Sequence, residues 1–288
     1  MPQTINTNLA SLNAQRNLSM SQSSLSTSMQ RLSSGLRVNS AKDDAAGLAI
    51  AERMNAQVRG MNVAVRNAND GISMSQTAEG GLGKVTDALQ RMRELAVQAA
   101  NATNSNSDKD SLDKEFGELA KEVQRVLGGT TFNGKAILGA NAGAQTFQVG
   151  ANTTTNDSIN VTTIDLTVAA TITVVAGTDN TGAGRAVIDN TANSAAIHTV
   201  IDNIDAALTT ANTERATMGA SQSRFDAVIS NLHTSVENQT AARSRIMDAD
   251  FAAETANLSR ANILQQAGNA MVAQANQLPQ QVLRLLQN

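Results

Sequence analysis

One helical repeat dominates the second half of the chain, from Ile197 to Ile246. Positions spaced alternately by four and three residues are mostly apolar, whereas the residues between them are mainly Asn, Thr, Ser, Ala and scattered charges. This period is typical of a long helix that packs along a narrow seam against other helices. The seam positions are Ile197, Ile201, Ile204, Leu208, Ala211, Arg215, Met218, Gln222, Phe225, Ile229, Leu232, Val236, Gln239, Arg243 and Ile246.

Four members of this seam are polar: Arg215, Gln222, Gln239 and Arg243. Buried polar seam positions weaken a uniform two-stranded coiled coil. They favour a bundle in which some seam positions meet polar neighbours or another subunit. A helix this long also needs partner helices of similar length.

A second long helix is predicted from about Lys42 to about Ala100. Asp43 and Asp44 suit the positive end of its dipole. Gly80, Gly81 and Gly83 mark a local weakness within it. Its seam positions are Val58, Met61, Val65, Ala68, Ile72, Ser75, Glu79, Leu82, Thr86, Leu89, Arg93 and Ala96.

The two ends of the chain carry thinner helical patterns. From Ile5 to Leu36 the apolar residues form two offset stripes among many Ser, Gln, Asn and Thr residues, which are poor helix formers. The last helix follows Asp250, with large apolar residues every seven positions and Pro279 late in it. We expect both end helices to be marginal alone and to fold with a partner. Their predicted assembly seam comprises Ile5, Leu9, Leu12, Leu25, Leu32, Leu264, Met271, Leu278 and Leu285.

The middle of the chain changes character. The polar run Asn101–Asp110 predicts a loop, and a shorter helix follows from Leu112 to Val126, ended by Gly128 and Gly129. Asn133-Gly134 is a strong tight-turn signal. Near-alternate apolar residues then predict short β-hairpins, and Gly177–Gly184 predicts an exposed tip. The hairpin residues are Phe147, Val149, Ile159, Val161, Ile164, Ile172, Val174 and Val175.

These patterns predict a mainly α fold with a small β region. The terminal helices pair in a long antiparallel helical bundle, so the two ends lie together. The expected terminal domain comprises residues 1–42 and 254–288, and the expected rod-like domain comprises residues 43–253 with hairpins at about 130–185. A stable middle with two weakly folded ends favours polymerisation.

Composition narrows the possible functions. Aromatic residues make up only 2% of the chain, with no Trp or Tyr, so the core must consist of Leu, Ile, Val, Ala and Met, as long helices packed together require. A net charge of −3 does not indicate the basic surface that a nucleic-acid-binding protein needs. The absence of Cys excludes disulfides and thiolate chemistry. The start lacks a secretory signal pattern, and no run of eighteen apolar residues predicts membrane insertion.

No motif for catalysis, cofactor binding or metal binding emerges. His198 and His233 are far apart and lie off the seam, and no His-Glu-x-x-His motif occurs. The glycine-rich run before Lys84 lacks the Ser or Thr that a phosphate loop needs, because Val85 follows. Paired carboxylates such as Asp248 and Asp250 are explained by helix capping. The chain is therefore not expected to be an enzyme.

Several separate stretches resemble the bacterial flagellin family. At the amino-terminal end, residues 30–47 (QRLSSGLRVNSAKDDAAG) match its signature. At the carboxy-terminal end, residues 242–251 (ARSRIMDADF), 263–268 (ILQQAG), 273–277 (AQANQ) and 282–286 (VLRLL) match as well. Residues 131–134 (TFNG) and 147–152 (FQVGAN) resemble the family's first hairpins. The resemblance covers nearly all of residues 1–165 and 190–288.

The resemblance implies a structural subunit of the extracellular flagellar filament, which serves swimming motility. It also implies export of the unfolded chain through the flagellar type III apparatus, with an export chaperone, a filament cap and a hook–filament junction protein as partners. The chain departs from many members in having only residues 153–184 where outer β domains are inserted. It is therefore expected to lack those domains and to form a slim, smooth filament.

The family also implies contact with the host's flagellin-sensing Toll-like receptor. By resemblance, the contact set is Gln90, Arg91, Leu95, Gln98 and Glu115, a surface that is also expected to serve protofilament contacts. The plain alternative is that Leu89 and Leu95 belong to the core and that the others form a solvated face. The carboxy-terminal Leu283, Leu285 and Leu286 resemble residues read by the intracellular flagellin sensor, although assembly alone would explain them.

Three other functions remain open. A hook–filament junction protein shares the terminal architecture but matches these signatures less closely. A secreted coiled-coil adhesin would not require both ends to be helical and adjacent. An enzyme in the mid-chain insert would need more chain than residues 153–184 provide to bury a site.

Overall fold

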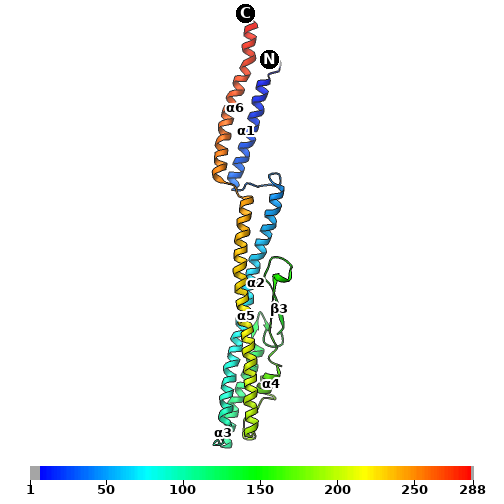
Figure 1. The fold of residues 1–288 in the computed structure, drawn as a ribbon, viewed down its shortest axis with the longest axis vertical. Helices are drawn as coiled ribbons and strands as arrows, with labels where there is room; N and C mark the ends of the chain where they lie inside the picture. Colours follow the sequence, from blue (N-terminus) through cyan, green and yellow to red (C-terminus); the bar gives the residue numbers. More distant parts are fainter. Residues whose placement is uncertain (1–6, 287–288) are drawn as a thin grey trace. The chain divides into compact units, whose positions relative to one another are not determined.

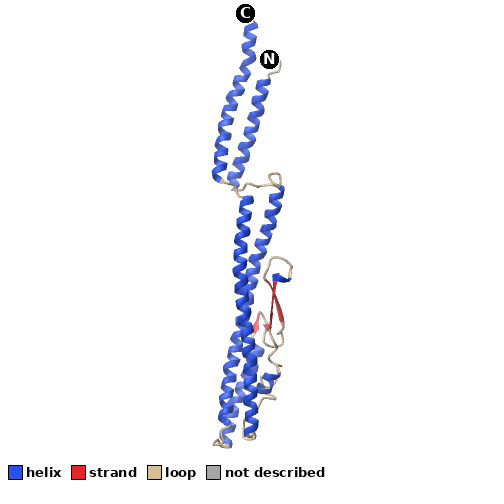
Figure 2. Ribbon diagram, in the orientation of Figure 1, coloured by secondary structure: helices blue, strands red, loops and turns tan. Residues whose placement is uncertain are grey.

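The computed structural model describes residues 7–286, with side chains as far as residue 277. Figures 1 and 2 show a mainly helical chain with a small β region, so the predicted fold class is confirmed. The helices are α1 (Leu9–Ser34), α2 (Ala45–Ala99), α3 (Asn106–Gly129), α4 (Ala170–Ala176), α5 (Ser194–Met247) and α6 (Phe251–Leu286). The strands are β1 (Thr131–Phe132), β2 (Lys135–Ala136), β3 (Ala144–Gln148) and β4 (Ser158–Thr162), with a 3-10 turn at Thr155–Asp157.

The chain divides into two compact units. The terminal unit combines the two ends of the chain, up to Ala56 and from Glu237 onward, and the middle unit comprises Gln57–Val236. The domain boundaries expected after residues 42 and 253 remain a prediction. No helix among the described residues is long and apolar enough to cross a membrane.

In the terminal unit, α1 and α6 lie side by side and antiparallel, so the start of α1 and the end of α6 lie at the same end of the pair (Figure 1). The Asn8 Nδ2 donates a hydrogen bond to the Ala275 carbonyl over 2.7 Å, and the Ser11 hydroxyl donates to Asn276 Oδ1 over 2.7 Å. The expected pairing of the two chain ends is therefore present in the structure.

The link between α1 and α2 is a tight, hydrogen-bonded segment. Gly35 ends α1 in the left-handed conformation at φ 71°, where glycine is favoured, and its amide donates to the Arg31 carbonyl. Its carbonyl accepts from the Ala249 amide over 2.9 Å, and the Arg37 amide donates to the Met247 carbonyl over 2.7 Å. These bonds hold the link against the end of α5, within the terminal unit.

The second helix begins at Ala45 rather than at the predicted Lys42. The Asp43 carboxylate accepts from the Ser40 and Asn39 amides, which lowers its pKa and closes a turn before the helix. Asp44 Oδ1 accepts from the Gly47 amide over 2.7 Å, as a capping residue does. Both carboxylates thus act at a helix start, as expected, but they precede the helix.

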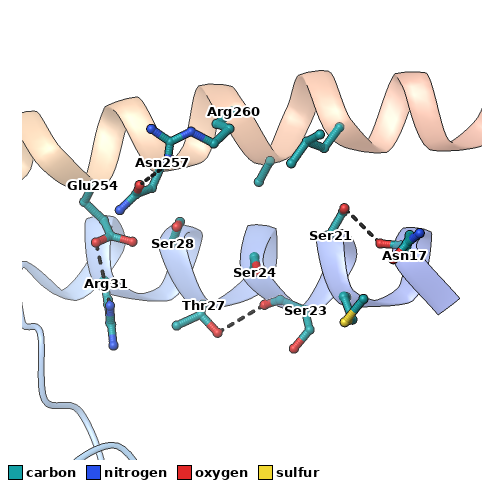
Figure 3. A pocket seen from close by; sticks show the side chains of 13 residues that line it. Asn17, Ser21, Ser23, Ser24, Thr27, Ser28, Arg31, Glu254, Asn257 and Arg260 are labelled. Atoms are coloured by element: carbon teal, nitrogen blue, oxygen red, sulfur yellow. Dashed lines mark hydrogen bonds and ion pairs between the residues drawn. The ribbon is translucent and has the colours of Figure 1, made fainter.

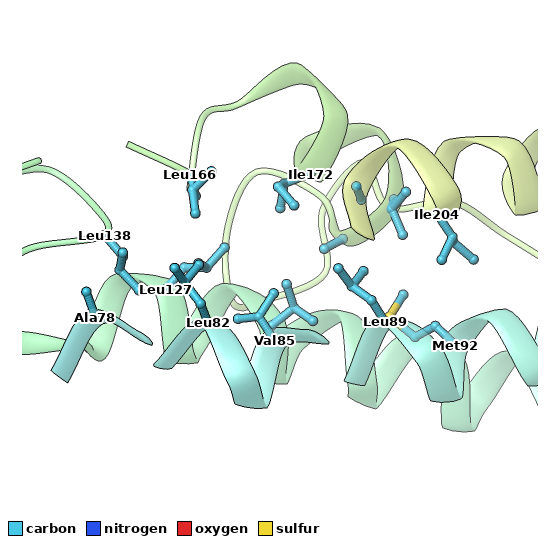
Figure 4. Close-up of a cluster of buried hydrophobic side chains, with 14 of the residues drawn as sticks. Ala78, Leu82, Val85, Leu89, Met92, Leu127, Leu138, Leu166, Ile172 and Ile204 are labelled. Carbon is cyan, nitrogen blue, oxygen red and sulfur yellow. The ribbon is translucent and has the colours of Figure 1, made fainter. Parts of the chain in front are cut away.

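The middle unit holds the main core. Figure 4 shows large apolar side chains of α2, α3, α4 and α5 packed together with the loop residues Leu138 and Leu166. Leu82, Leu89 and Met92 of α2 are completely buried. Every seam position predicted on α5 is buried or half-buried, in whichever unit it lies.

Two of the four polar seam positions meet a polar neighbour in the middle unit. The guanidinium of Arg215 lies 3.8 Å from the Glu79 carboxylate, and the Gln222 amide donates to the same carboxylate over 3.2 Å. The expectation of polar neighbours is therefore met for these two residues. On α2, by contrast, the predicted seam member Arg93 is exposed and pairs with Asp205 at 2.6 Å.

The glycines predicted as a local weakness do not interrupt α2, which runs unbroken to Ala99. Two glycines of α2, Gly71 and Gly81, allow other parts of the chain to approach closely. A Cβ at Gly81 would lie 2.6 Å from the Thr130 hydroxyl, and a Cβ at Gly71 would lie 2.5 Å from the ring of Phe225. Phe225 is fully buried and meets Phe147 edge to face, with ring centroids 5.5 Å apart.

Replacing Gly71 by Ala should destabilise the middle unit by about 1–2 kcal/mol, because overpacking a rigid ring outweighs the gain in helix propensity. The matched control is Gly80→Ala, where an added Cβ meets nothing within 4 Å and should stabilise the helix by up to about 1 kcal/mol. Urea unfolding of both variants measures the two changes. Equal stability of the two variants would contradict the close packing at Gly71.

The predicted hairpins form for the first two apolar runs. Asn133 and Gly134 have φ of 49° and 77°, the positive values of a two-residue hairpin turn between β1 and β2. β3 pairs with β4 antiparallel, with Phe147 opposite Ile159. The strand predicted for the third run is wrong, because residues 170–176 form helix α4, with Ile172, Val175 and Ala176 buried on one face.

Two further boundaries differ from the prediction. α3 begins at Asn106, inside the expected loop, because Ser105 and Asp108 form a capping box. Gly177, expected in an exposed tip, is buried at φ 84°, and a Cβ there would clash with the Ala183 carbonyl oxygen. The rest of the tip, Thr178–Gly184, is largely exposed.

Candidate assembly surface

The interior of the α1/α6 pair combines small residues with leucines. Buried and half-buried positions recur along both helices at alternating spacings of three and four. On α1 they include Ser11, Ala14, Leu18, Ser21, Leu25, Ser28 and Leu32, and on α6 they are Glu254, Leu258, Ala261, Gln265, Gly268, Val272 and Ala275. A Cβ at Gly268 would lie 3.1 Å from a methyl of Leu18, so the two backbones approach closely there.

The large apolar side chains of this pair mostly face outward. Leu9 is 69% exposed, Ile263 is 66% exposed and Met271 is 61% exposed. Leu12, Met20, Met29 and Leu264 are exposed to about half. Phe251, at the start of α6, is 57% exposed. Single exposed apolar residues are common on proteins, but eight on one helix pair form an unusually apolar surface.

The predicted assembly residues fall into three groups. Leu9, Leu12, Leu264 and Met271 are exposed, whereas Leu25 and Leu32 are half-buried within the pair. Ile5 lies outside the described residues, and the side chains of Leu278 and Leu285 lie outside the described side chains. The same holds for Leu283 and Leu286.

A groove of about 720 Å³ runs between α1 and α6 (Figure 3). Its lining is rich in hydroxyl groups from α1, with Ser24 and Ser28 toward α6, and it ends at Arg31 and Glu254, whose charged groups are 3.8 Å apart. A second pocket of about 330 Å³ shares Asn17, Ser21 and Leu264 with the first. The shared lining places both on one flank of the pair.

The second predicted site lies on α2 and α3 in the middle unit. The Arg91 guanidinium donates to Glu94 and Glu115 over 2.9 Å each, and these hydrogen bonds raise the pKa of Arg91. Gln90 and Gln98 are exposed. Leu95 is only 1% exposed and belongs to the core, so four of the five predicted residues lie at the surface and Leu95 lies beneath them.

One ion pair of the middle unit joins residues that lie far apart in the sequence. Asp113 of α3 accepts hydrogen bonds from Arg185 and from the Ile188 amide over 2.9 Å each. Burial raises the pKa of Asp113, but these bonds outweigh it, so the pKa lies below its ordinary value. Arg185 also lies over the Phe116 ring, 6.0 Å from its centroid. Asp113 and Arg185 are 72 positions apart, so no local sequence pattern predicts this ion pair and only the folded structure shows it.

The remaining candidate ligands and carboxylates have structural explanations. Among residues 7–286, no group of three or more His, Cys, Asp or Glu residues is placed to hold a metal ion. His198 and His233 are exposed, in agreement with their interpretation as solvated residues. Asp250 accepts from the Ala252 and Ala253 amides at the start of α6, so capping accounts for it.

Comparison with known proteins agrees with this architecture. Residues 5–143 match the bacterial flagellin N-terminal helical region, and residues 201–286 match the bacterial flagellin C-terminal helical region. A flagellin of Halalkalibacterium halodurans is 45% identical over 283 residues, covering 98% of this chain and 99% of that protein. A flagellin of Bacillus subtilis is 41% identical over 304 residues, covering 98% and 99%. The crystal structure of Bacillus cereus flagellin is 32% identical, with a TM-score of 0.47, and covers 58% of this chain and 88% of that chain. This chain belongs to the bacterial flagellin family.

Proposed function

We propose that this chain works as a flagellar filament subunit by burying the outer faces of its α1/α6 pair against other copies. Its family is that of a structural filament protein, not of an enzyme. The observation that carries the proposal is that most of the large apolar side chains of the pair, Leu9, Ile263 and Met271 among them, are exposed in the single chain. Such a surface is stable only when neighbouring subunits cover it, so folding of the ends and polymerisation support each other.

The same proposal covers export and location. Thinly amphipathic ends suit passage as an unfolded chain through the type III apparatus, in contact with an export chaperone, followed by folding under a filament cap outside the cell. The first subunits would add to a hook–filament junction protein. Between β4 and α5 the chain forms only one short helix, α4, which supports a slim filament without outer domains.

Removal of residues 1–34, or of residues 251–288, should abolish elongation of wild-type filament seeds, because either deletion removes one helix of the pair. The free energy of unfolding of the middle unit should stay within about 0.5 kcal/mol of the wild-type value, because its core lies in residues 57–236. Seeded sedimentation measures elongation, and circular dichroism measures unfolding. A truncated chain that still elongates seeds would refute the proposal.

A second proposal concerns the Arg91 surface as the contact for the host's flagellin-sensing Toll-like receptor. Arg91 is held between Glu94 and Glu115, and a guanidinium fixed in this way is a common interface anchor. Arg91→Ala should weaken receptor binding at least about tenfold. Arg125→Ala is the matched control, since Arg125 is also exposed and paired within its helix, with Glu122 at 2.6 Å. Equal loss of binding in both variants would contradict a specific role for Arg91.

A further inference from the structure

Among the described residues, the methionines range from buried to exposed, with Met54 half-buried. Met74, Met92 and Met218, in the core of the middle unit, are at most 3% exposed, and Met61 and Met247 are 6% exposed. Met20 is 56% exposed, Met29 57% and Met271 61%, and all three lie on the α1/α6 pair. A thioether on the surface is open to oxidation, whereas a buried one is protected.

Among the described residues of the terminal unit, these three thioethers are the most exposed oxidisable groups, since Met54 is half-buried and Met247 is buried. The chain has no Cys, Trp or Tyr, and its only two His residues, His198 and His233, lie in the middle unit. A mild oxidant that reaches the α1/α6 pair therefore reacts with methionine first.

We propose that Met20, Met29 and Met271 form a reversible oxidation site that prevents unassembled subunits from polymerising. In the reaction with hydrogen peroxide, the thioether sulfur attacks one peroxide oxygen and the O–O bond breaks. An S–O bond forms and the second oxygen leaves as water. The sulfur loses two electrons and becomes a sulfoxide, while the peroxide is reduced.

The position of these residues connects the modification to assembly, and this step depends on the proposed function. Met20 lines the 720 Å³ groove, and Met271 lines the adjoining pocket. A sulfoxide places a strong hydrogen-bond acceptor on a face that neighbouring copies cover. A buried acceptor without a donor opposes association, whereas the parent thioether packs as an apolar group. Incorporation into a filament buries the same residues and protects them.

The test uses the full-length chain and hydrogen peroxide. Peptide mass spectrometry of the treated monomer should find Met20, Met29 and Met271 oxidised at least about tenfold faster than Met74, Met92 and Met218. Seeded elongation by the oxidised chain should fall roughly tenfold or more. Treatment with methionine sulfoxide reductases should restore elongation, which shows that the effect lies in the sulfoxides and not in irreversible damage.

The matched control is the triple variant Met20→Leu, Met29→Leu and Met271→Leu. It preserves apolar volume and should elongate seeds equally well with and without peroxide. Normal elongation by wild-type chain oxidised at all three positions would overturn the inference and leave the proposed function intact. Equal oxidation rates for exposed and buried methionines would also overturn it. Failure of untreated wild-type chain to elongate seeds would instead contradict the proposed function.

Discussion

The double substitution Leu12→Lys and Leu264→Lys should lower seeded elongation at least about 100-fold. Each leucine is half-exposed in the single chain, and burial of a leucine side chain contributes roughly 1.5–3 kcal/mol. Because each leucine is already half-buried, the two together lose roughly 1.5–3 kcal/mol of association free energy, a factor of about 10 to 150. The cost of burying two charges adds to this loss. Lysine is a good helix former, so the helicity of the pair should remain.

The control for this variant is Val174→Lys. Val174 is 50% exposed, as Leu264 is, but it lies on α4 in the middle unit. If the α1/α6 surface carries assembly, the control should elongate seeds within about threefold of wild type. Loss of elongation in the control alone would move the main interface to the middle unit. Sedimentation of seeded mixtures distinguishes these outcomes.

Replacing Asp113 by Ala should destabilise the middle unit by about 3–5 kcal/mol. The substitution leaves the half-buried Arg185 without its charge partner and the Ile188 amide without its acceptor. Removing one partner of a buried ion pair lowers the free energy of unfolding by about this amount. Asp87→Asn is the matched control, since Asp87 is 70% exposed and pairs loosely with Lys84 at 3.5 Å. It should change the stability by less than about 0.5 kcal/mol. Urea unfolding measures both.

The same residue predicts a pH dependence. The pKa of Asp113 is lower in the folded chain than its ordinary value of 3.8, so its contribution to stability is complete above that value and is lost as the pH falls through the folded pKa. The difference in unfolding free energy between wild type and Asp113→Ala should therefore shrink below about pH 4. A difference that stays constant from pH 7 to pH 2 would show that the charge of Asp113 contributes nothing.

The long helices could be predicted because their period is repeated many times. On α5 every predicted seam position is buried or half-buried, from Ile197 to Ile246. Long, regular patterns average out local exceptions such as Arg93, which is exposed because it pairs with Asp205. The Asn133-Gly134 turn was also predictable, since two adjacent residues with positive φ leave few other sequences possible.

Short segments were less predictable. Ile172, Val174 and Val175 fit a strand and a helix equally well over seven residues, and burial of Ile172, Val175 and Ala176 on one face favours the helix. The Asp113–Arg185 pair depends on how a loop crosses α3, which no local pattern encodes. The outward position of Leu9, Ile263 and Met271 on α1 and α6 was hidden for a different reason. A helical stripe shows which residues share a face but not whether its partner belongs to the same chain.

The most direct test of this mechanism is amide hydrogen exchange on the wild-type chain as monomer and as filament. We expect peptides from α1 and α6 to exchange rapidly in the monomer and to become strongly protected in the filament. Peptides around Leu82–Met92, in the core of the middle unit, should exchange slowly in both states. Terminal helices that are already fully protected in the monomer would contradict the claim that assembly stabilises them.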